Sequence, residues 1–448
     1  MISPDLATVR PAPRLRGELR LPGDKSISHR ALILAALATG ESRISGAGGG
    51  ADVRSTASVM RALGATVEVR PDDDSRNVAY RVVSPGADGL AEPDGILDCG
   101  NSGTTLRLVA GVVAGLPLTA VLDGDDSLRR RPVARIIEPL RRMGAVLHGR
   151  RHDSLPPLTV VGHTPLLAID YTTPVPSAQV KSAILLAGTR ADGRTTVRER
   201  VATRDHTERM LRARGVPVER AASDEGVALT VEGGTAVQAI DQHVPADVSA
   251  AAFWLVAASI HPDAELTLRD VGINPTRRAI VDHLRAMGAD IDERPDPAAA
   301  GALSDTGEPI ADLVVRSSDL RAIDLGPADV AGAIDEIPVL CLAATQARGV
   351  TTIRGAGELR HKESDRIAGI AAGLVALGAD IQVDGDDLII RGGTPLRGTT
   401  TDSLDDHRLA MTFAVAGLVA GEGTTIERSD SAAISYPGFF ADLEGVRA

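Results

Sequence analysis

The pattern of hydrophobic and polar positions repeats along the chain. A run with helical spacing of apolar residues ends in a glycine, short strand-like runs follow, and this occurs at Gly64, Gly144, Gly215, Gly288, Gly378 and, more faintly, Gly445. A glycine at this place is typical of a left-handed helix C-cap. Successive glycines lie 80, 71, 73, 90 and 67 residues apart, so six units fill the chain.

Each unit is predicted to contain a strand, a first helix, a strand, a second helix and two further strands. For the fourth unit we expect helices at 247–259 and 276–287 with strands at 265–269, 290–294 and 312–316, and for the fifth, helices at 334–346 and 362–377 with strands at 351–354, 380–383 and 387–391. First helices such as 182–187 and 411–419 are apolar nearly all round, which predicts burial. Paired strands after each second helix argue against a doubly wound sheet, where one strand separates helices.

Six equal units divide most simply into two domains of three, with a boundary near 240–244. The segment 295–308 is rich in Pro, Ala, Asp and Gly, and it is interpreted as a surface loop within the second domain.

Composition narrows the class of function. The 448 residues carry a net charge of −12 and only 2% aromatic residues, which disfavours nucleic acid and anionic membranes as partners. Cys99 and Cys341 lie outside any spacing typical of a disulfide framework or a zinc site. No signal-peptide pattern is visible, and the apolar runs near 250–260 and 412–421 are too short to span a bilayer. We therefore expect a soluble, cytoplasmic protein.

The stretch 22–30 predicts an anion pocket. Pro22 and Gly23 favour a turn, Asp24 or Ser26 can cap the following helix, and the free amides of its first turn attract anions. Ser26 and Arg30 stand at i and i+4, so both can face one ligand. The spacing is not that of a P-loop.

Cations recur where the predicted helices begin, at Lys25, Arg131, Arg204, Arg277, Lys362, Arg366 and Arg408. Each is unfavourable beside a helix N-terminus by about 0.3–1 kcal/mol unless an anion offsets the charge. The repetition predicts convergence on one cleft between two domains, against the alternative of an exposed, salt-bridged surface. Asp335, Glu336 and Glu363 add carboxylates suited to proton transfer. His206 and His407 lack metal-ligand spacing, and no metal is expected.

Ordered motifs across nearly the whole chain resemble one family. They are PGDKSISHR (22–30), GNSGTTLR (100–107), Arg131-Pro132, SAQVK (177–181), Asp335-Glu336, LRHKESDR (359–366) and DHR (406–408). Together they resemble the 5-enolpyruvylshikimate-3-phosphate synthases, and RDHTE (204–208) with NPTR (274–277) resembles their class II branch.

The resemblance implies an α/β fold of two inside-out α/β barrel domains, enolpyruvyl transferase-like, with three βαβαββ units each. Residues 21–243 would form the shikimate 3-phosphate side, residues 1–20 plus 244–448 the second domain, and the active site would lie in the interdomain cleft. The implied reaction transfers the enolpyruvyl group of phosphoenolpyruvate to the 5-hydroxyl of shikimate 3-phosphate through a tetrahedral intermediate. No cofactor or metal is implied, and a monomer is expected.

Site residues follow from the matching motifs. The resemblance implies that shikimate 3-phosphate is held by Lys25, Ser26, Arg30, Ser177, Ala178, Gln179, Asp335 and Lys362. It implies that phosphoenolpyruvate is held by Lys25, Gly103, Arg131, Gln179, Arg366 and Arg408, and that Asp335, Glu363 and Lys25 carry the catalysis.

Two positions depart from the pattern of some relatives. Ile434 precedes Ser435-Tyr436-Pro437 where they carry Lys, and Glu358 stands where they carry Asn. The nearest alternative function is enolpyruvyl transfer to UDP-N-acetylglucosamine, but the stretch before Arg131 lacks the Cys common in that relative and Ser26 replaces Asn. A non-catalytic repeat scaffold that binds a polyanion is the alternative from another class.

Overall fold

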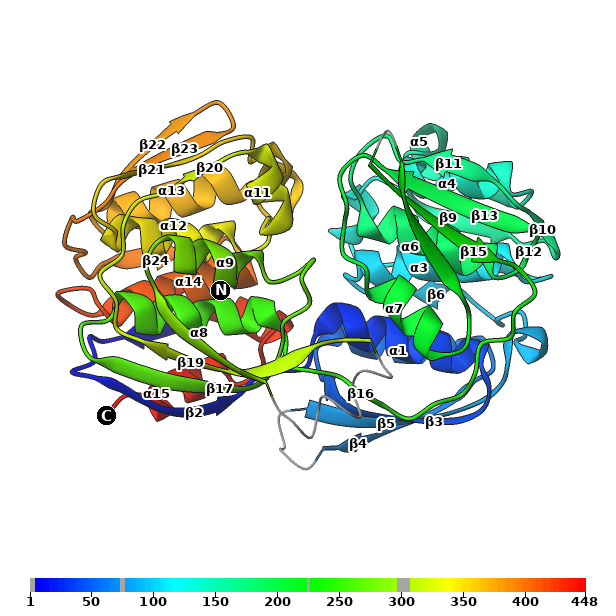
Figure 1. Cartoon of the computed structure of the whole chain (residues 1–448), viewed down its shortest axis with the longest axis horizontal. Coiled ribbons are helices and arrows are strands. Elements are labelled where there is room, and N and C mark those ends of the chain that lie inside the picture. The colour runs from blue at the N-terminus through cyan, green and yellow to red at the C-terminus, as the bar shows by residue number, and fades with distance from the viewer. Residues whose placement is uncertain (1–4, 73–76, 224–225, 296–306) are drawn as a thin grey trace. The chain divides into compact units, whose positions relative to one another are not determined.

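The computed structural model describes residues 5–72, 77–223, 226–295 and 307–448. The chain divides into two compact units (Figure 1). We call Gly23–Val244 with Gly301–Glu308 the N-terminal unit, and Met1–Pro22, Pro245–Ala300 and Pro309–Ala448 the C-terminal unit. The divisions at Pro22 and Val244 lie within two residues of those expected. The predicted surface loop at 295–308 falls almost entirely outside the described residues.

The N-terminal unit contains three four-stranded sheets, each with two helices. The first has β16 (Gln242–His243), β3 (Thr39–Gly48), β5 (Asn77–Pro85) and β4 (Thr66–Pro71), with α1 (Lys25–Leu37) and α2 (Ala51–Ala62). The second has β6 (Leu97–Asp98), β7 (Thr119–Asp123), β9 (Leu155–Val161) and β8 (Val146–Gly149), with α3 (Gly103–Ala114) and α4 (Ala134–Arg142). The third has β11 (Asp170–Thr172), β13 (Arg194–Glu199), β15 (Gly226–Glu232) and β14 (Val218–Ser223), with α6 (Ala178–Gly188) and α7 (His206–Ala213).

Shorter elements complete this unit. They are η1 (Ala87–Gly89), η2 (Leu128–Arg130), the left-handed turn α5 (Arg150–Asp153), and the two-stranded sheet of β10 (Leu166–Leu167) and β12 (Ala191–Asp192).

The C-terminal unit repeats the arrangement. One sheet has β2 (Leu15–Arg20), β17 (Ala264–Gly272), β19 (Ile310–Arg316) and β18 (Asp290–Pro295), with α8 (Val248–Ile260) and α9 (Ala279–Ala286). The next has β20 (Asp324–Leu325), β21 (Val350–Ile353), β23 (Asp387–Arg391) and β22 (Asp380–Asp384), with α11 (Pro327–Gly332), α12 (Ile337–Gln346), η3 (Gly357–His361) and α13 (Arg366–Ala376). The last has β24 (Thr400–Asp402), β25 (Thr424–Glu427) and β1 (Leu6–Val9), with α14 (His407–Gly417), η4 (Ser429–Ile434) and α15 (Phe439–Gly445).

All six of these sheets share one pairing rule. In each sheet one pair of strands is parallel and every other pair is antiparallel. Three sheets borrow a strand from a distant part of the chain: β1 and β2 come from the N-terminus, and β16 comes from the end of the third unit. The expected mixed α/β class is confirmed. Among the described residues no sheet closes into a barrel, so the inside-out barrel stays a prediction.

The first helices form the cores, as their apolar sequences predict. In the C-terminal unit α8, α12 and α14 contact one another, and in α8 every residue from Val248 to Ser259 is buried. In the N-terminal unit α3 packs closely on α6, because a Cβ on Gly111 would lie 2.4 Å from the carbonyl oxygen of Ala183. None of the described helices combines the length and hydropathy needed to span a bilayer.

Five of the six predicted glycine caps are confirmed. Gly64, Gly144, Gly215, Gly288 and Gly378 follow their helices with φ between 79° and 102°, where a side chain would be strained. The prediction at Gly445 is wrong. This glycine is the last residue of α15 itself, and Val446 closes the helix with φ −93°.

Candidate active site

The start of α1 places Lys25 in the N-terminal unit. Asp24 caps the helix by accepting a hydrogen bond from the amide of Ile27 at 2.9 Å, as the sequence predicts. The ammonium of Lys25 lies 2.9 Å from Asp52 Oδ2 of α2. Burial works to raise the pKa of Asp52, but the charge and hydrogen bond of Lys25, together with His29 and Arg131, outweigh burial, and the pKa is lowered. A carboxylate from the chain thus already faces this lysine.

Arg30 lies beneath the helix start and is buried. Its guanidinium donates to Thr207 Oγ1 at 2.7 Å, to Ser182 Oγ at 2.8 Å and to the carbonyl of Ser26 at 2.9 Å. Burial lowers its pKa to about 10. The structure therefore places Arg30 among protein groups, and a direct ligand contact through it stays a prediction. The hydroxyl of Ser26 is half-buried beside it.

The RDHTE motif supports this region. Besides Thr207, it supplies Glu208, which lies 2.8 Å from the buried ammonium of Lys181, while Glu199 lies 2.8 Å from the same nitrogen. His206 Nδ1 lies 2.8 Å from Glu308, and both side chains are buried. Among the described residues no cluster of His, Cys, Asp and Glu is suited to a metal ion.

A second group of polar side chains surrounds the start of α3. Ser102 caps α3, and Ser177 caps α6 by accepting from the amide of Val180 at 3.4 Å, so that Ala178 is the first residue of α6. Gln179 then bridges the two helices: Arg107 donates to its oxygen at 2.7 Å, and its amide donates to Thr104 Oγ1 at 2.9 Å.

Gly103 leaves room for two guanidinium groups. A Cβ at this position would lie 2.6 Å from Arg107 Nη1 and 3.5 Å from Arg131 Nη1. Arg131 donates to Asn101 Oδ1, and Arg107 donates to the carbonyl of Pro132 at 3.0 Å. Within the described part of the chain neither arginine forms an ion pair with a carboxylate. Burial, with Arg135 and Arg131 nearby, lowers the pKa of Arg107 to about 10. This group can accept an anion.

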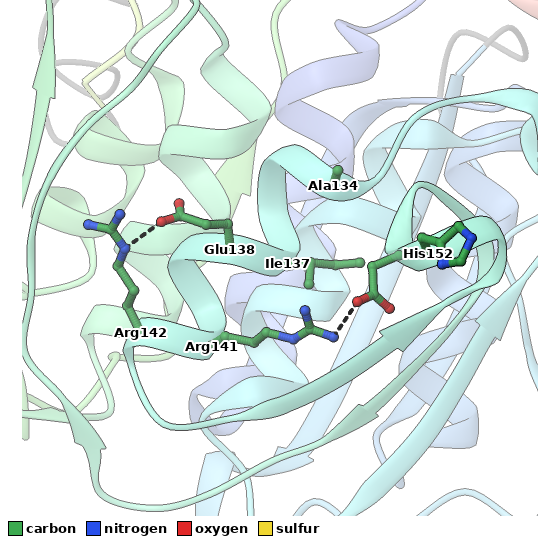
Figure 2. Close-up of a pocket in the computed structure, with 7 residues that line it drawn as sticks. Ala134, Ile137, Glu138, Arg141, Arg142 and His152 are labelled. Carbon is green, nitrogen blue, oxygen red and sulfur yellow. Dashed lines mark hydrogen bonds and ion pairs between the residues drawn. The ribbon is translucent and has the colours of Figure 1, made fainter.

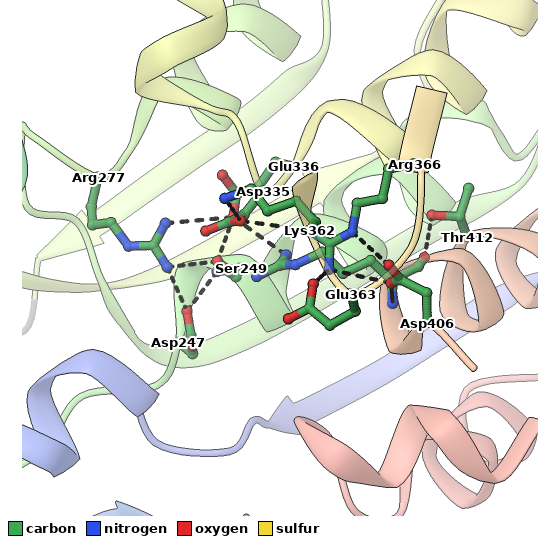
Figure 3. Close-up of polar contacts among 11 residues, drawn as sticks. Asp247, Ser249, Arg277, Asp335, Glu336, Lys362, Glu363, Arg366, Asp406 and Thr412 are labelled. Carbon is green, nitrogen blue, oxygen red and sulfur yellow. Dashed lines mark hydrogen bonds and ion pairs between the residues drawn. The ribbon is translucent and has the colours of Figure 1, made fainter. Parts of the chain in front are cut away.

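In the C-terminal unit a buried arginine gathers three carboxylates (Figure 3). Arg366, at the start of α13, lies 2.6 Å from Glu363, 2.7 Å from Asp406 and 3.6 Å from Asp335. Burial works to lower the pKa of Arg366, but these carboxylates outweigh it and raise the pKa. Lys362 lies 3.4 Å from Asp335 as a second cation. Two expected acid-base groups and two expected substrate-binding cations therefore lie together.

The N-cap of α14 holds the cluster in place. Asp406 caps this helix by accepting from the amide of Arg408 at 2.9 Å, and Ser364 donates to its other oxygen at 3.0 Å. Burial works to raise the pKa of Asp406, yet the charge and hydrogen bond of Arg366, together with His407, outweigh burial, and the pKa is lowered. Asp406 is therefore ionised and acts as a support for Arg366. His407 beside it is buried, and burial lowers its pKa to about 3.

Arg408 points to a different carboxylate. Its guanidinium lies 3.5 Å from Glu336 Oε1, which also lies 3.5 Å from Arg277. Carboxylates of the chain offset the charges of several helix-start cations. They face Lys25, Arg277, Lys362, Arg366 and Arg408. For Arg131 an anion from a ligand stays a prediction.

Residues that sequence reasoning missed are the partners of the expected ones. Asp52, Arg107 and Asp406 each contact or adjoin an expected site residue. A signal existed for two of them, because Arg107 ends GNSGTTLR and Asp406 opens DHR. Asp52 carries no such signal, since its pairing with Lys25 arises only when α2 packs on α1.

The two departures from the pattern lie outside these clusters. Glu358 lies within η3, and Ile434 is 39% exposed at the end of η4. Tyr436 is buried nearby, where it accepts from Trp254 Nε1 at 3.2 Å and donates to Asp442 at 2.7 Å.

One surface pocket in the N-terminal unit is a separate feature (Figure 2). It lies between α4 and the turn α5, and its charged groups pair with one another: Arg142 with Glu138, and Arg141 with Asp153 at 2.7 Å. None of the expected site residues lines it. The charged groups described in each unit, rather than this pocket, contain the candidate site residues.

Comparison with known proteins follows the same motifs. The sequence profile described as EPSP synthase (3-phosphoshikimate 1-carboxyvinyltransferase) matches residues 9–443. The 3-phosphoshikimate 1-carboxyvinyltransferase of Gloeobacter violaceus is 51% identical over 441 residues, covering 98% of both chains. That of Geobacter sulfurreducens is 47% identical, covering 97% of this chain and 98% of its own. The solved structure of EPSP synthase from Acinetobacter baumannii superposes with a TM-score of 0.87 at 38% identity, covering 99% of this chain and 98% of its own.

Proposed function

The chain belongs to the EPSP synthase family, the 3-phosphoshikimate 1-carboxyvinyltransferases, and from that premise we propose how its residues divide the reaction. The enzyme transfers the enolpyruvyl group of phosphoenolpyruvate to the 5-hydroxyl of shikimate 3-phosphate and releases phosphate, a step of aromatic amino acid biosynthesis. The family match supports this acceptor over UDP-N-acetylglucosamine.

The observation that carries the assignment of roles is the buried guanidinium of Arg366 between Glu363, Asp406 and Asp335. It brings two candidate proton-transfer groups to one cation, with Lys362 beside them. Such a group can hold anionic substrates and move protons without further partners.

Shikimate 3-phosphate is bound by Lys25, Ser26, Ser177, Ala178, Gln179, Asp335 and Lys362 in this proposal, with Arg30 beneath them. Phosphoenolpyruvate is bound by Lys25, Gly103, Arg131, Gln179, Arg366 and Arg408. The helix N-terminus of α3 supports an anion there, and so does the lack, among the described residues, of a carboxylate paired with Arg131. Residues of both units act on one substrate pair, with the three sheets of each unit arranged as an inside-out barrel.

The proton traffic follows from the carboxylates. Asp335 is assigned to shikimate 3-phosphate, so it takes the proton of the 5-hydroxyl as that oxygen attacks C2 of phosphoenolpyruvate. Glu363 delivers a proton to the methylene carbon, which gives the tetrahedral intermediate. In the second step a proton leaves the methyl group, the carbon–oxygen bond to phosphate breaks, and the enol ether forms. Lys25, Arg131 and Arg366 stabilise the negative charge throughout.

Glu363→Gln tests the assignment. The amide keeps the shape of the side chain but cannot deliver a proton, so we expect kcat to fall by at least about 100-fold while both substrates still bind. Phosphate release and calorimetric binding measure the two effects. Glu358→Gln, in the preceding 3₁₀ helix, is the matched control and should retain turnover. Undiminished kcat in Glu363→Gln would show that another group moves the proton.

The acceptor is tested separately. Phosphate release is measured with phosphoenolpyruvate and either shikimate 3-phosphate or UDP-N-acetylglucosamine, and we expect turnover with the first alone. The enzyme is further proposed to act as a monomer in the cytoplasm, which sedimentation and cell fractionation can check.

A further inference from the structure

Glu336 has no role in the reaction as proposed, yet it occupies the centre of the C-terminal cluster. It is the N-cap residue of α12, and its side chain is fully buried. One carboxylate oxygen, Oε1, accepts a hydrogen bond from Ser249 at the start of α8. The same oxygen lies 3.5 Å from Arg277, which precedes α9, and 3.5 Å from Arg408 of α14. Glu336, in the middle repeat of this unit, thus contacts side chains from the first and the last repeats through one atom.

Arg277 belongs to the NPTR motif and is turned into the protein. Its side chain is 4% exposed, and it donates to Ser249 Oγ at 2.6 Å and to Asp247 Oδ1 at 3.2 Å. These contacts fix the guanidinium between the start of α8 and Glu336. Arg277 of this motif therefore holds Glu336 in place. We expect it not to contact a ligand.

Arg408 depends on Glu336 for its placement. Within the described residues Glu336 is the one carboxylate recorded against the Arg408 guanidinium, whose side chain is 12% exposed. Each arginine lies 3.5 Å from Oε1, longer than the roughly 2.7–2.9 Å of a tight charge-assisted hydrogen bond. Glu336 Oε2 is buried and accepts no hydrogen bond from the described residues. Arg408 is thus oriented by Glu336 without being tightly bound to it.

We propose that Glu336, held by Ser249 and Arg277, is a positioning residue that orients the guanidinium of Arg408 toward phosphoenolpyruvate. The inference rests on the role of Arg408 in the proposed function. Glu336 touches neither substrate, and it moves no proton. Its negative charge and its fixed place set where Arg408 presents its donors.

Glu336→Gln is the primary test. The variant keeps the size of the side chain and an acceptor for Ser249 but loses the charge that orients Arg408. We expect the KM for phosphoenolpyruvate to rise about tenfold, the KM for shikimate 3-phosphate to change less than about twofold, and kcat to stay within about threefold. Glu293→Gln is the matched control. Glu293 also bridges two arginines, Arg278 and Arg285, and neither is an expected site residue. It should leave both KM values unchanged.

A double-variant cycle with Arg408→Gln separates positioning from general structural damage. If Glu336 acts through Arg408, Glu336→Gln should change the phosphoenolpyruvate KM less than about twofold in the Arg408→Gln background. The inference would be overturned if the two substitutions multiplied each other's effect on the phosphoenolpyruvate KM. It would also be overturned if both KM values rose equally or if only kcat fell. An Arg408→Gln enzyme with an unchanged phosphoenolpyruvate KM would instead overturn the proposed role of Arg408, so the two failures are distinguishable.

Ser249→Ala covers the case in which Glu336→Gln does not fold. It removes the hydroxyl that holds Glu336 Oε1 and changes no charge. We expect a rise of about threefold in the phosphoenolpyruvate KM alone. An unchanged KM in a folded Ser249→Ala enzyme would contradict the inference.

Discussion

Arg131 and Arg366 are both proposed to bind an anion, but their guanidinium groups have different partners within the protein. Arg366 is buried against three carboxylates that hold its orientation. Arg131 contacts neutral groups, the amide oxygen of Asn101 and the hydroxyl of Ser127. A substrate anion at Arg131 therefore meets an uncompensated positive charge, whereas one at Arg366 shares the cation with acids of the protein.

Arg131→Ala should weaken phosphoenolpyruvate far more than shikimate 3-phosphate. Loss of a hydrogen bond to a charged group costs about 1.5–3 kcal/mol, or roughly a 10–100-fold rise in the phosphoenolpyruvate KM. Steady-state kinetics with each substrate varied in turn measures the difference. The adjacent Arg130 is exposed, so Arg130→Ala is the control. Similar increases in both KM values would contradict the proposed role.

The buried histidines set a pH dependence of stability. Burial lowers the pKa of both His29 and His407 to about 3, while an unfolded histidine titrates near 6.5. Between these values the unfolded chain binds protons that the folded chain does not. The free energy of unfolding must therefore decrease as the pH falls from about 6.5 toward 3.

His407→Gln should remove one proton from this dependence. We expect the slope of the unfolding free energy between pH 6 and pH 4 to fall by up to about 1.4 kcal/mol per pH unit. Urea unfolding at a series of pH values measures it. The exposed His148 provides the control variant His148→Gln. An identical slope in wild type and His407→Gln would show that His407 is protonated in the folded state.

The helices show where sequence reasoning succeeds and where it stops. The C-terminal ends were predictable, because a glycine with positive φ follows five of the helices. Several starts come later than the pattern predicts: α12 begins at Ile337 rather than 334, α9 at Ala279 rather than 276, and α13 at Arg366 rather than 362. Before α9, Asn274 accepts a hydrogen bond from the amide of Thr276 and forms a turn in place of a helical turn, whereas Asp365 is the N-cap of α13 and accepts from the amide of Ala368.

The sequence predicts candidate residues of the site, but it does not predict which residues pair with them. Motifs identify Lys25, Glu363 and Arg366, because they repeat at helix starts and resemble those of a family. That Lys25 faces Asp52, or that Arg408 faces Glu336, depends on packing between elements distant in sequence. Hydrophobic periodicity carries no information about such partners.

Contact between α3 and α6 depends on the absence of a side chain at Gly111. A Cβ there would meet the backbone of Ala183 at 2.4–2.9 Å, so Gly111→Ala must push the helices apart. We expect a loss of about 1–3 kcal/mol in the free energy of unfolding, despite the better helix propensity of alanine. Gly95→Ala is the control, since no atom lies within 4 Å of its added Cβ. Denaturant unfolding of both variants measures the difference, and equal stabilities would refute the tight contact.

At the scale of the whole molecule, the C-terminal unit is discontinuous in sequence. Strand β2 pairs in parallel with β17 along six residues, and β1 pairs antiparallel with β25. Val9, Leu15 and Leu19 from these strands are buried in the same core as α8 and α14. The amide of the last residue, Ala448, bonds to the carbonyl of Arg14 at 3.3 Å. Residues 6–20 are thus part of the unit whose other residues are synthesised last.

A fragment of residues 245–448 should therefore not fold alone. It would expose the edge of β17 and the core positions that Val9, Leu15 and Leu19 fill, each worth about 1.5–3 kcal/mol when buried. The same fragment joined from Ala448 through a flexible linker to residues 1–22 should unfold cooperatively. Far-UV circular dichroism during urea titration distinguishes the two. Cooperative unfolding of the shorter fragment at the same midpoint would show that this unit folds without β1 and β2.

The pairing of β1 with β25 also imposes a delay during synthesis on the ribosome. Val9 is synthesised 415 residues before Thr424, its partner in β25. At about 5–20 residues per second, β1 waits roughly 20–80 s for that partner. While residues 23–244 are synthesised and can fold, β1 has no partner strand. A chaperone or a protease can bind it during that interval. Cleavage within residues 6–20 of stalled nascent chains, and its disappearance after release, would reveal the wait.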